Sequence, residues 1–234
     1  METHLHHHKE QHLTSSETLM DIVIGMSDGL TVPFALAAGL SGAVKDVHLI
    51  VIAGIAEIAA GSIAMGLGGY LAGKTEQDHY NSELKREYQE VKDLPHVEKQ
   101  EVKDFFAELG LSEEVQEKAT REIIKDDDRW VTFMMKHELG LDKPDPKRAG
   151  KSAFNIGASY IVGGFVPLLP YFFVDDGITG LKYSALFAII SLLIFGYFKS
   201  KMTGMNPITG ALKVAVIGAL AAGCAFAIAR LIQA

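Results

Sequence analysis

The sequence predicts an all-α integral membrane protein: five transmembrane helices per protomer, with a helical polar domain inserted between helices 2 and 3. Two observations lead to this fold class. Five apolar runs are each long enough to cross a bilayer, whose hydrocarbon requires roughly 20 apolar residues. Most of the charged residues, in contrast, lie in one stretch, from Lys74 to Lys151, which has the composition of a soluble domain.

The apolar runs divide the chain into four parts. A tail covers residues 1–19, transmembrane helices 1 and 2 cover 20–73, the polar domain covers 74–148, and transmembrane helices 3–5 cover 149–234. The runs themselves are 20–44, 48–72, 149–174, 178–198 and 207–232. Lys and Arg are concentrated on the side of the polar domain, so the positive-inside bias places that domain and the N-terminus in the cytosol and the C-terminus in the lumen.

The charge balance excludes some classes of partner. The formal net charge is −7, and a nucleic-acid-binding protein needs a basic patch, so we expect no nucleic-acid partner. The single cysteine, Cys224, excludes a disulfide framework and a thiolate metal cluster. The histidine run of the tail, between His4 and His12, is open to two interpretations: a metal-binding segment or a disordered tail.

The first two runs contain groups that a simple membrane anchor does not need. Asp28 lies in the first run, and Glu57 and Met65 lie in the second. An ionisable residue inside a span is costly and indicates a functional site. At helical rise, Asp28 and Met65 lie at about the same depth, roughly 12 Å from the cytosolic side, and Glu57 lies about two turns further across. The alternative is a satisfied buried carboxylate with a core methionine.

Local composition supports a cation path through the same runs. Pro33 lacks a backbone donor, so it frees the carbonyl of Gly29 beside Asp28, and a free carbonyl next to a carboxylate suits a cation. Small residues recur every fourth position in the second run, and this stripe is expected to pack closely against another helix. The stripe comprises Ala56, Ala60, Ala64 and Gly68.

The polar domain carries carboxylates at helical spacing. The second span continues as a helix as far as Pro95, another helix follows, and a further helix begins at Ser112 with a core stripe that includes Val115 and Trp130. Glutamates share a face on the first two helices, and two methionines precede a glutamate near the end of the domain: Glu87 and Glu90; Glu98 and Glu101; Met134, Met135 and Glu138. A glutamate run is often only a solvated face. Thioethers, however, favour transition metals such as Fe²⁺ over hard cations.

Long motifs in this sequence resemble those of one family. The segments SDGLTVPFALAAGL and AEIAAGSIAMGLGGYLA, together with the five-span pattern and its Glu-rich insert, resemble the vacuolar iron transporter family, and the plant members most closely. The resemblance extends from Met20 to the C-terminus. It implies an Fe²⁺/H⁺ antiporter in the vacuolar membrane, which loads ferrous iron from the cytosol into the vacuole as a homodimer of five-helix protomers. The resemblance implies neither an enzymatic activity nor a prosthetic group.

The resemblance also implies the metal-binding positions. Asp28, Glu57 and Met65 match the membrane pathway, and the seven residues from Glu87 to Glu138 named above match the cytosolic metal-binding domain. The cargo that it implies is Fe²⁺, with Mn²⁺, Co²⁺ and Zn²⁺ as further candidates. Three alternatives stay open: a membrane-anchored ferroxidase, a metal sensor that does not transport, and a transporter primarily for Mn²⁺.

Overall fold

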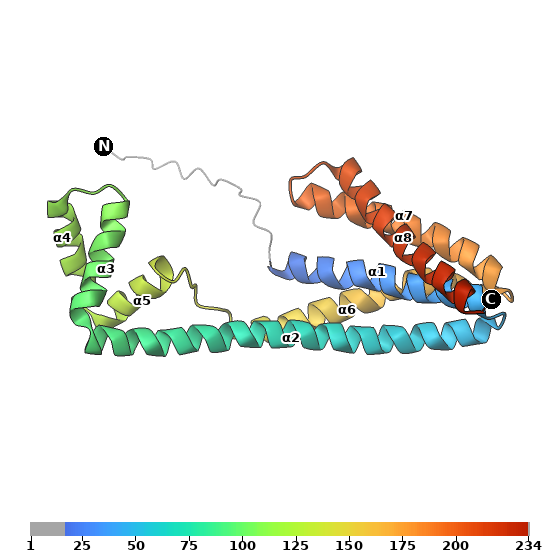
Figure 1. Ribbon diagram of the computed structural model, residues 1–234, viewed down its shortest axis with the longest axis horizontal. Coiled ribbons are helices and arrows are strands. Elements are labelled where there is room, and N and C mark those ends of the chain that lie inside the picture. Colours follow the sequence, from blue (N-terminus) through green and yellow to red (C-terminus); the bar gives the residue numbers. More distant parts are fainter. Residues whose placement is uncertain (1–16, 234) are drawn as a thin grey trace, which may run out of the picture. The chain divides into compact units, whose positions relative to one another are not determined.

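The structure, a computed structural model, describes residues 17–233, so the histidine run of the tail lies outside the described residues. Every regular element in this range is helical (Figure 1). In chain order the elements are α1 (Glu17–Ala43), α2 (Val47–Asp93), α3 (Pro95–Glu108), α4 (Glu113–Ile123), α5 (Asp127–His137), α6 (Arg148–Leu168), the 3₁₀ helix η1 (Leu169–Phe173), α7 (Gly177–Met202) and α8 (Pro207–Gln233).

Five of these helical segments are long and apolar enough to cross a membrane. They are α1, α2, α6 with η1, α7 and α8, which correspond to the five predicted runs. For residues 17–233, the prediction of an all-α fold with five helices long and apolar enough to span a membrane is confirmed. The third predicted span ends differently from a regular helix, because its last residues form η1 around Pro170.

Contacts divide the described chain into two compact units. One contains the residues up to Tyr70 and those from Gly150 onward, and the other is Leu71–Ala149. The first boundary falls inside α2 and the second inside α6.

In the first unit, α6 lies between α1 and α2, and glycines allow the close approach (Figure 1). Gly25 and Gly29 of α1 lie directly against the backbone of α6, where a β-carbon would collide with the carbonyl oxygens of Ile156 and Tyr160. Gly66 of α2 contacts α6 from its other side. Small residues let helix backbones meet without voids, so these positions set the packing of α6.

The prediction that the small-residue stripe of α2 packs closely against another helix is wrong for contacts among residues 17–233. Its four residues are exposed, and a side chain at Gly68 would meet nothing within 4 Å. The face that packs against α6 is instead the neighbouring one, which includes Gly54, Gly61 and Gly69. Spacing of four identified a face of the helix, but two such faces lie side by side and composition did not distinguish them.

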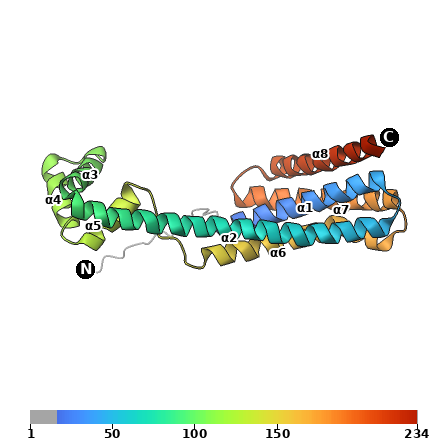
Figure 2. The same ribbon diagram turned by 60° about the horizontal axis from the view of Figure 1, so that its bottom comes forward.

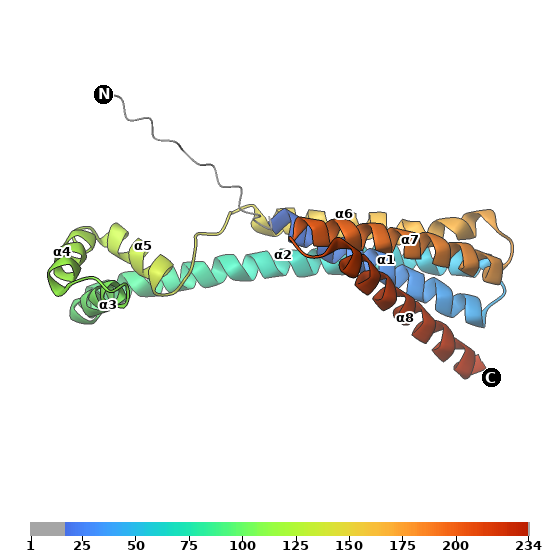
Figure 3. The ribbon, with the colours of Figure 1, turned by 90° about the horizontal axis from the view of Figure 1, so that it is seen from above.

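Helices α7 and α8 pack against α1 and against each other (Figure 3). The contact is made mainly by small side chains around one aromatic ring, with Phe34 and Ala38 of α1 against Ala188 of α7 and Ala222 of α8. Helix α1 is continuous through Pro33, so the structure shows no unwound segment there. Pro33 still leaves the Gly29 carbonyl without its usual amide donor, because proline has no N–H.

In the second unit, α3, α4 and α5 gather at the C-terminal end of α2 (Figure 2). Pro95 occupies the first turn of α3, as a helix start allows, and Ser112 is the N-cap residue of α4, as predicted. The predicted core stripe is only partly correct. Trp130 is buried, but on the separate helix α5, while Val115 is exposed. The core of the unit is Val91, Val102, Trp130, Val131, Met134 and Met135.

Candidate metal centres

Three of the predicted glutamates meet in the second unit. Glu87 of α2, Glu98 of α3 and Glu138, the C-cap residue of α5, each offer a carboxylate oxygen, and these oxygens all lie within 4.8 Å of one another. We call these three residues the glutamate cluster. Glu87 and Glu98 are 2% and 4% exposed, which is rare for glutamate. Their distance from one another fits ligands of a single cation.

The hydrophobic core explains how residues so far apart in sequence meet. Each glutamate of the cluster lies four residues from a core residue of its own helix: Glu87 from Val91, Glu98 from Val102, and Glu138 from Met134. Side chains four apart share one helix face. Burial of the three core residues in one cluster therefore brings the three carboxylates together beside it.

The cluster is electrostatically unfavourable without a cation. Burial, followed by the charge of Glu138, raises the pKa of Glu87 to about 7, and burial, followed by the charge of Glu101, raises the pKa of Glu98 to about 7. The pKa of Glu138 is also raised, by burial first. One oxygen each of Glu87 and Glu98 is buried without a hydrogen-bond partner in the part of the chain that the structure describes. A divalent cation would supply the missing partner and offset the repulsion.

The other two predicted glutamates lie at the edge of the cluster. Glu90 and Glu101 are half-buried, and their charges act on the cluster carboxyls. Glu90 is also paired with Arg86, whose Nε lies 3.4 Å from Glu90 Oε2. All five predicted glutamates of the insert are therefore in one electrostatic neighbourhood, with three close enough to share an ion.

The two predicted methionines are core residues in this structure. Met134 and Met135 are each 1% exposed and pack with Val91, Val102 and Trp130. Met134 is one turn before Glu138, so its thioether is on the cluster's helix face. Its role as a metal ligand stays a prediction.

Metal binding by the full chain is expected to strengthen as pH rises from 6 to 8. With the pKa values of Glu87 and Glu98 at about 7, a metal ion must displace protons below that pH, which costs up to about tenfold in affinity per pH unit for each proton displaced. Calorimetric titration of the detergent-solubilised chain with Mn²⁺, which resists oxidation, would measure this. Equal affinity at pH 6 and pH 8 would contradict the assignment.

In the first unit, the structure links Glu57 to a residue that the sequence did not single out. The Tyr160 hydroxyl of α6 donates a hydrogen bond to Glu57 Oε1 at 2.5 Å. The second oxygen of Glu57 is buried and has no partner among residues 17–233. The sequence offered only one signal for Tyr160, its position as one of two tyrosines in the third apolar run, and this predicts no partner by itself.

Asp28 and Met65 each lie next to a glycine that packs against α6, Gly29 and Gly66 respectively. Asp28 precedes Gly29, which packs on the Tyr160 backbone, and Met65 lies one turn after Gly61, which packs on the Tyr160 ring. The equal membrane depth that the sequence predicts for the two residues stays a prediction. Both side chains are half-buried. Their direct approach to one another, and their binding of a shared ion, stay predictions.

A fully buried acid, Asp21, lies on the same face of α1 as the half-buried Asp28, seven residues earlier. Asp21 is 2% exposed and accepts hydrogen bonds from Ser152 Oγ at 3.0 Å and Asn155 Nδ2 at 3.4 Å. Sequence reasoning missed it because it stands at the edge of the first run. Ser152, Asn155 and Ser159 at helical spacing on α6 were the available signal.

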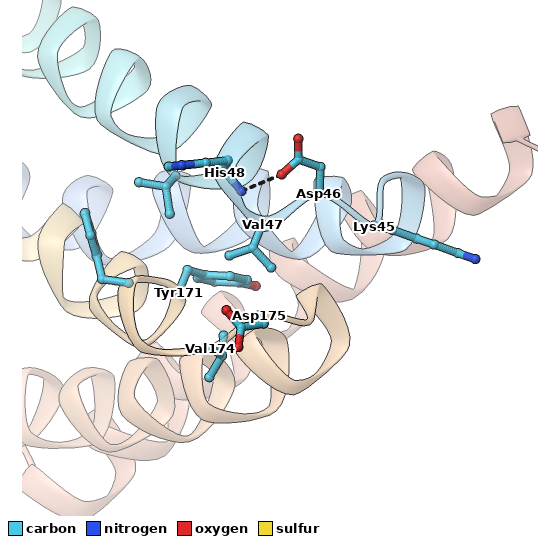
Figure 4. Close-up of a pocket in the computed structure, with 9 residues that line it drawn as sticks. Lys45, Asp46, Val47, His48, Tyr171, Val174 and Asp175 are labelled. Carbon is cyan, nitrogen blue, oxygen red and sulfur yellow. Dashed lines mark hydrogen bonds between the residues drawn. The ribbon is translucent and has the colours of Figure 1, made fainter.

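The first unit also has a pocket of about 400 Å³ between the α1–α2 connection and the segment after η1 (Figure 4). Its polar lining includes Asp46, His48 and Asp175, all exposed, and the His48 backbone N–H donates to Asp46 Oδ1 at 2.9 Å. The structure describes all ten predicted site residues, and none of them lines this pocket. Shape alone therefore does not identify the metal centres.

Comparison with known proteins covers almost the whole chain. The description of the matching family model is the VIT family, and it matches residues 19–230. The chain is 49% identical over 229 residues to Vacuolar iron transporter 1 of Tulipa gesneriana, which covers 98% of this chain and 93% of that protein. It is 48% identical over 232 residues to Vacuolar iron transporter 1 of Arabidopsis thaliana, covering 99% and 93%. Protein CCC1 of Saccharomyces cerevisiae is 39% identical over 222 residues, covering 92% and 69%.

Proposed function

Because the chain belongs to the VIT family, we propose that it carries ferrous iron from the cytosol into the vacuole in exchange for protons. The relatives that it matches over nearly their full length are named vacuolar iron transporters. The observation that carries the proposal is the glutamate cluster, whose buried oxygens without partners would be satisfied by a divalent cation. Five helices that can cross a membrane supply the rest of a transporter.

The first step is capture of the ion in the cytosol. The glutamate cluster binds Fe²⁺, and Glu90 and Glu101 attract it to the cluster by their charge. Met134 and Met135 supply soft sulfur, which favours Fe²⁺ over Mg²⁺ or Ca²⁺. The raised pKa values of Glu87 and Glu98 keep this binding reversible, because a proton can replace the ion near pH 7.

The second step is passage through the membrane. The ion moves to Asp28 and Met65 and then past Glu57 toward the lumen. A charged carboxylate inside a span is costly unless it is paired with an opposite charge. A cation that moves from one carboxylate to the next provides that pairing at each of them in turn. A carboxylate holds either a metal ion or a proton. An acidic lumen therefore protonates Glu57 after release, and the proton returns to the cytosol as the site reloads.

The arrangement that we propose places the N-terminus and the insert in the cytosol and the C-terminus in the lumen, following the distribution of Lys and Arg. It also includes a homodimer. The support for the dimer is the exposed small-residue stripe of α2, which has no partner helix among residues 17–233 and would allow close contact with a second copy. Crosslinking of cysteines introduced at Ala60 tests that contact.

Proton coupling predicts that Fe²⁺ uptake depends on a pH gradient. Proteoliposomes that contain the full chain and are acidic inside should accumulate Fe²⁺ several-fold faster than those at equal pH, because the gradient protonates the releasing carboxylate. Anaerobic quenching of trapped calcein measures the rate. Uptake with the same rate at every gradient would contradict antiport while leaving transport itself intact.

The same assay separates the alternative functions. A panel of Fe²⁺, Mn²⁺, Co²⁺ and Zn²⁺ ranks the cargo and identifies a transporter primarily for Mn²⁺. A sensor would bind metal without any flux. A ferroxidase would consume oxygen when Fe²⁺ is added to the purified chain, whereas a transporter with divalent cargo would not.

A further inference from the structure

The hydrogen bond between Tyr160 and Glu57 makes the two oxygens of the Glu57 carboxyl group different from one another. Tyr160 is 2% exposed, and its hydroxyl holds Glu57 Oε1 from a helix more than one hundred residues further along the chain. Glu57 Oε2 is buried and has no partner in the described part of the chain. One oxygen is therefore engaged by the protein, and the other remains available for a ligand.

The position of Tyr160 is set from both sides of α6. On α2, the ring occupies the space above Gly61, where even a methyl group would collide with the ring atoms and the hydroxyl. On α1, the Tyr160 backbone lies against Gly29, next to Asp28. Gly61 is four residues after Glu57, so it lies on the same face of α2 and opens the slot through which the hydroxyl reaches the carboxyl group.

We propose that Tyr160 is a positioning residue that makes Glu57 a one-oxygen ligand and thereby sets ion selectivity. The inference rests on the proposed function. Ca²⁺ takes six to eight oxygen ligands and binds carboxylates through one or both oxygens. Because Oε1 already accepts the Tyr160 hydrogen bond, Oε2 is the oxygen of Glu57 that a cation meets without competing for it, and binding through one oxygen is favoured. Tyr160 therefore disfavours Ca²⁺, relative to a transition-metal ion with fewer ligands, by limiting the ligand count rather than by touching the ion.

The test compares Tyr160→Phe with the wild-type chain in proteoliposomes. Loss of the hydroxyl frees Oε1, so we expect the KM for Fe²⁺ to rise while Vmax is largely kept. We also expect Ca²⁺ to become a stronger inhibitor. The ratio of the Ca²⁺ inhibition constant to the Fe²⁺ KM should fall roughly tenfold, the usual effect of losing one hydrogen bond to a carboxylate. A purely structural role would lower the amount of active protein without changing that ratio.

Tyr171→Phe is the matched control. Tyr171 is also buried, and its hydroxyl bonds to the Ser41 hydroxyl at 2.8 Å, away from all ten predicted site residues. The Tyr171→Phe variant loses a buried tyrosine hydroxyl, as Tyr160→Phe does, but one that does not contact Glu57. Its selectivity ratio should therefore stay at the wild-type value. A change of equal size in both variants would overturn the inference.

A second variant covers the case in which Tyr160→Phe does not fold. Gly61→Ala keeps the tyrosine but pushes its ring away from Glu57, so it should shift the selectivity ratio in the same direction. Folded variants with wild-type KM and wild-type Ca²⁺ inhibition would overturn the role of Tyr160 alone. Absence of Fe²⁺ uptake by the wild-type chain would overturn the proposed function, and the inference with it.

Discussion

Replacing Asp28 with alanine is expected to abolish metal uptake, with a loss of at least about 100-fold. Asp28 is the only carboxylate predicted at its depth in the membrane, so no neighbour can replace its charge for a passing cation. Loss of groups that merely orient a metal ligand costs roughly 10–100-fold, and loss of a ligand costs more. Fe²⁺ uptake into proteoliposomes measures the effect.

The matched control for this prediction is Asp46→Ala. Asp46 is an exposed carboxylate in the α1–α2 connection of the same unit, where it accepts a hydrogen bond from the His48 backbone. Its removal should leave uptake near the wild-type rate. Size-exclusion profiles of both variants exclude misfolding as the cause. If the Asp28→Ala chain transports at the wild-type rate, the proposed path through α1 is wrong.

Replacing both Glu87 and Glu98 with glutamine is expected to remove metal binding at the glutamate cluster and to stabilise the metal-free protein at neutral pH. Both pKa values are raised to about 7, so the folded state holds these protons more tightly than the unfolded state. Their stabilising contribution is full below about pH 4.5, the model-peptide range, and is lost as pH rises through about 7. Glutamine is neutral at every pH and avoids that loss.

Thermal unfolding of the full chain separates the two effects. In the wild type, Tm without metal should fall between pH 5.5 and pH 8, and Mn²⁺ should raise it at pH 8 because binding stabilises the folded state. In the double variant, Tm should depend less on pH and should not respond to Mn²⁺. Glu113→Gln with Glu114→Gln, on the exposed first turn of α4, is the control. An unchanged Mn²⁺ response in the double variant would show that the metal binds elsewhere.

The sequence was sufficient to identify the family and the five helices that are long and apolar enough to span a membrane. A bilayer requires long apolar runs, so the five spanning helices could be predicted to within a few residues. Glutamates at helical spacing identified faces of α2 and α3, and the structure places Glu87 and Glu98 of those faces in one cluster with Glu138. The sequence did not distinguish these three from Glu90 and Glu101, because burial depends on the neighbouring helices.

Only the tertiary structure decided which face of each helix is packed and which helix it packs against. Periodicity marked small residues on α2, yet the face that packs on α6 is the one with Gly54, Gly61 and Gly69. Met134 and Met135 share the cluster's neighbourhood, but their burial in the core was not predicted.

Local patterns determined the helices and identified the candidate metal ligands, because hydropathy and helical periodicity are properties of short segments. The contact between Tyr160 and Glu57 joins residues 103 positions apart. It exists because α6 packs against α2 at Gly61, and no pattern within either segment contains that information. The sequence predicted a path through α1 and α2 alone, and only the packing of the helices shows that α6 lies beside both of them.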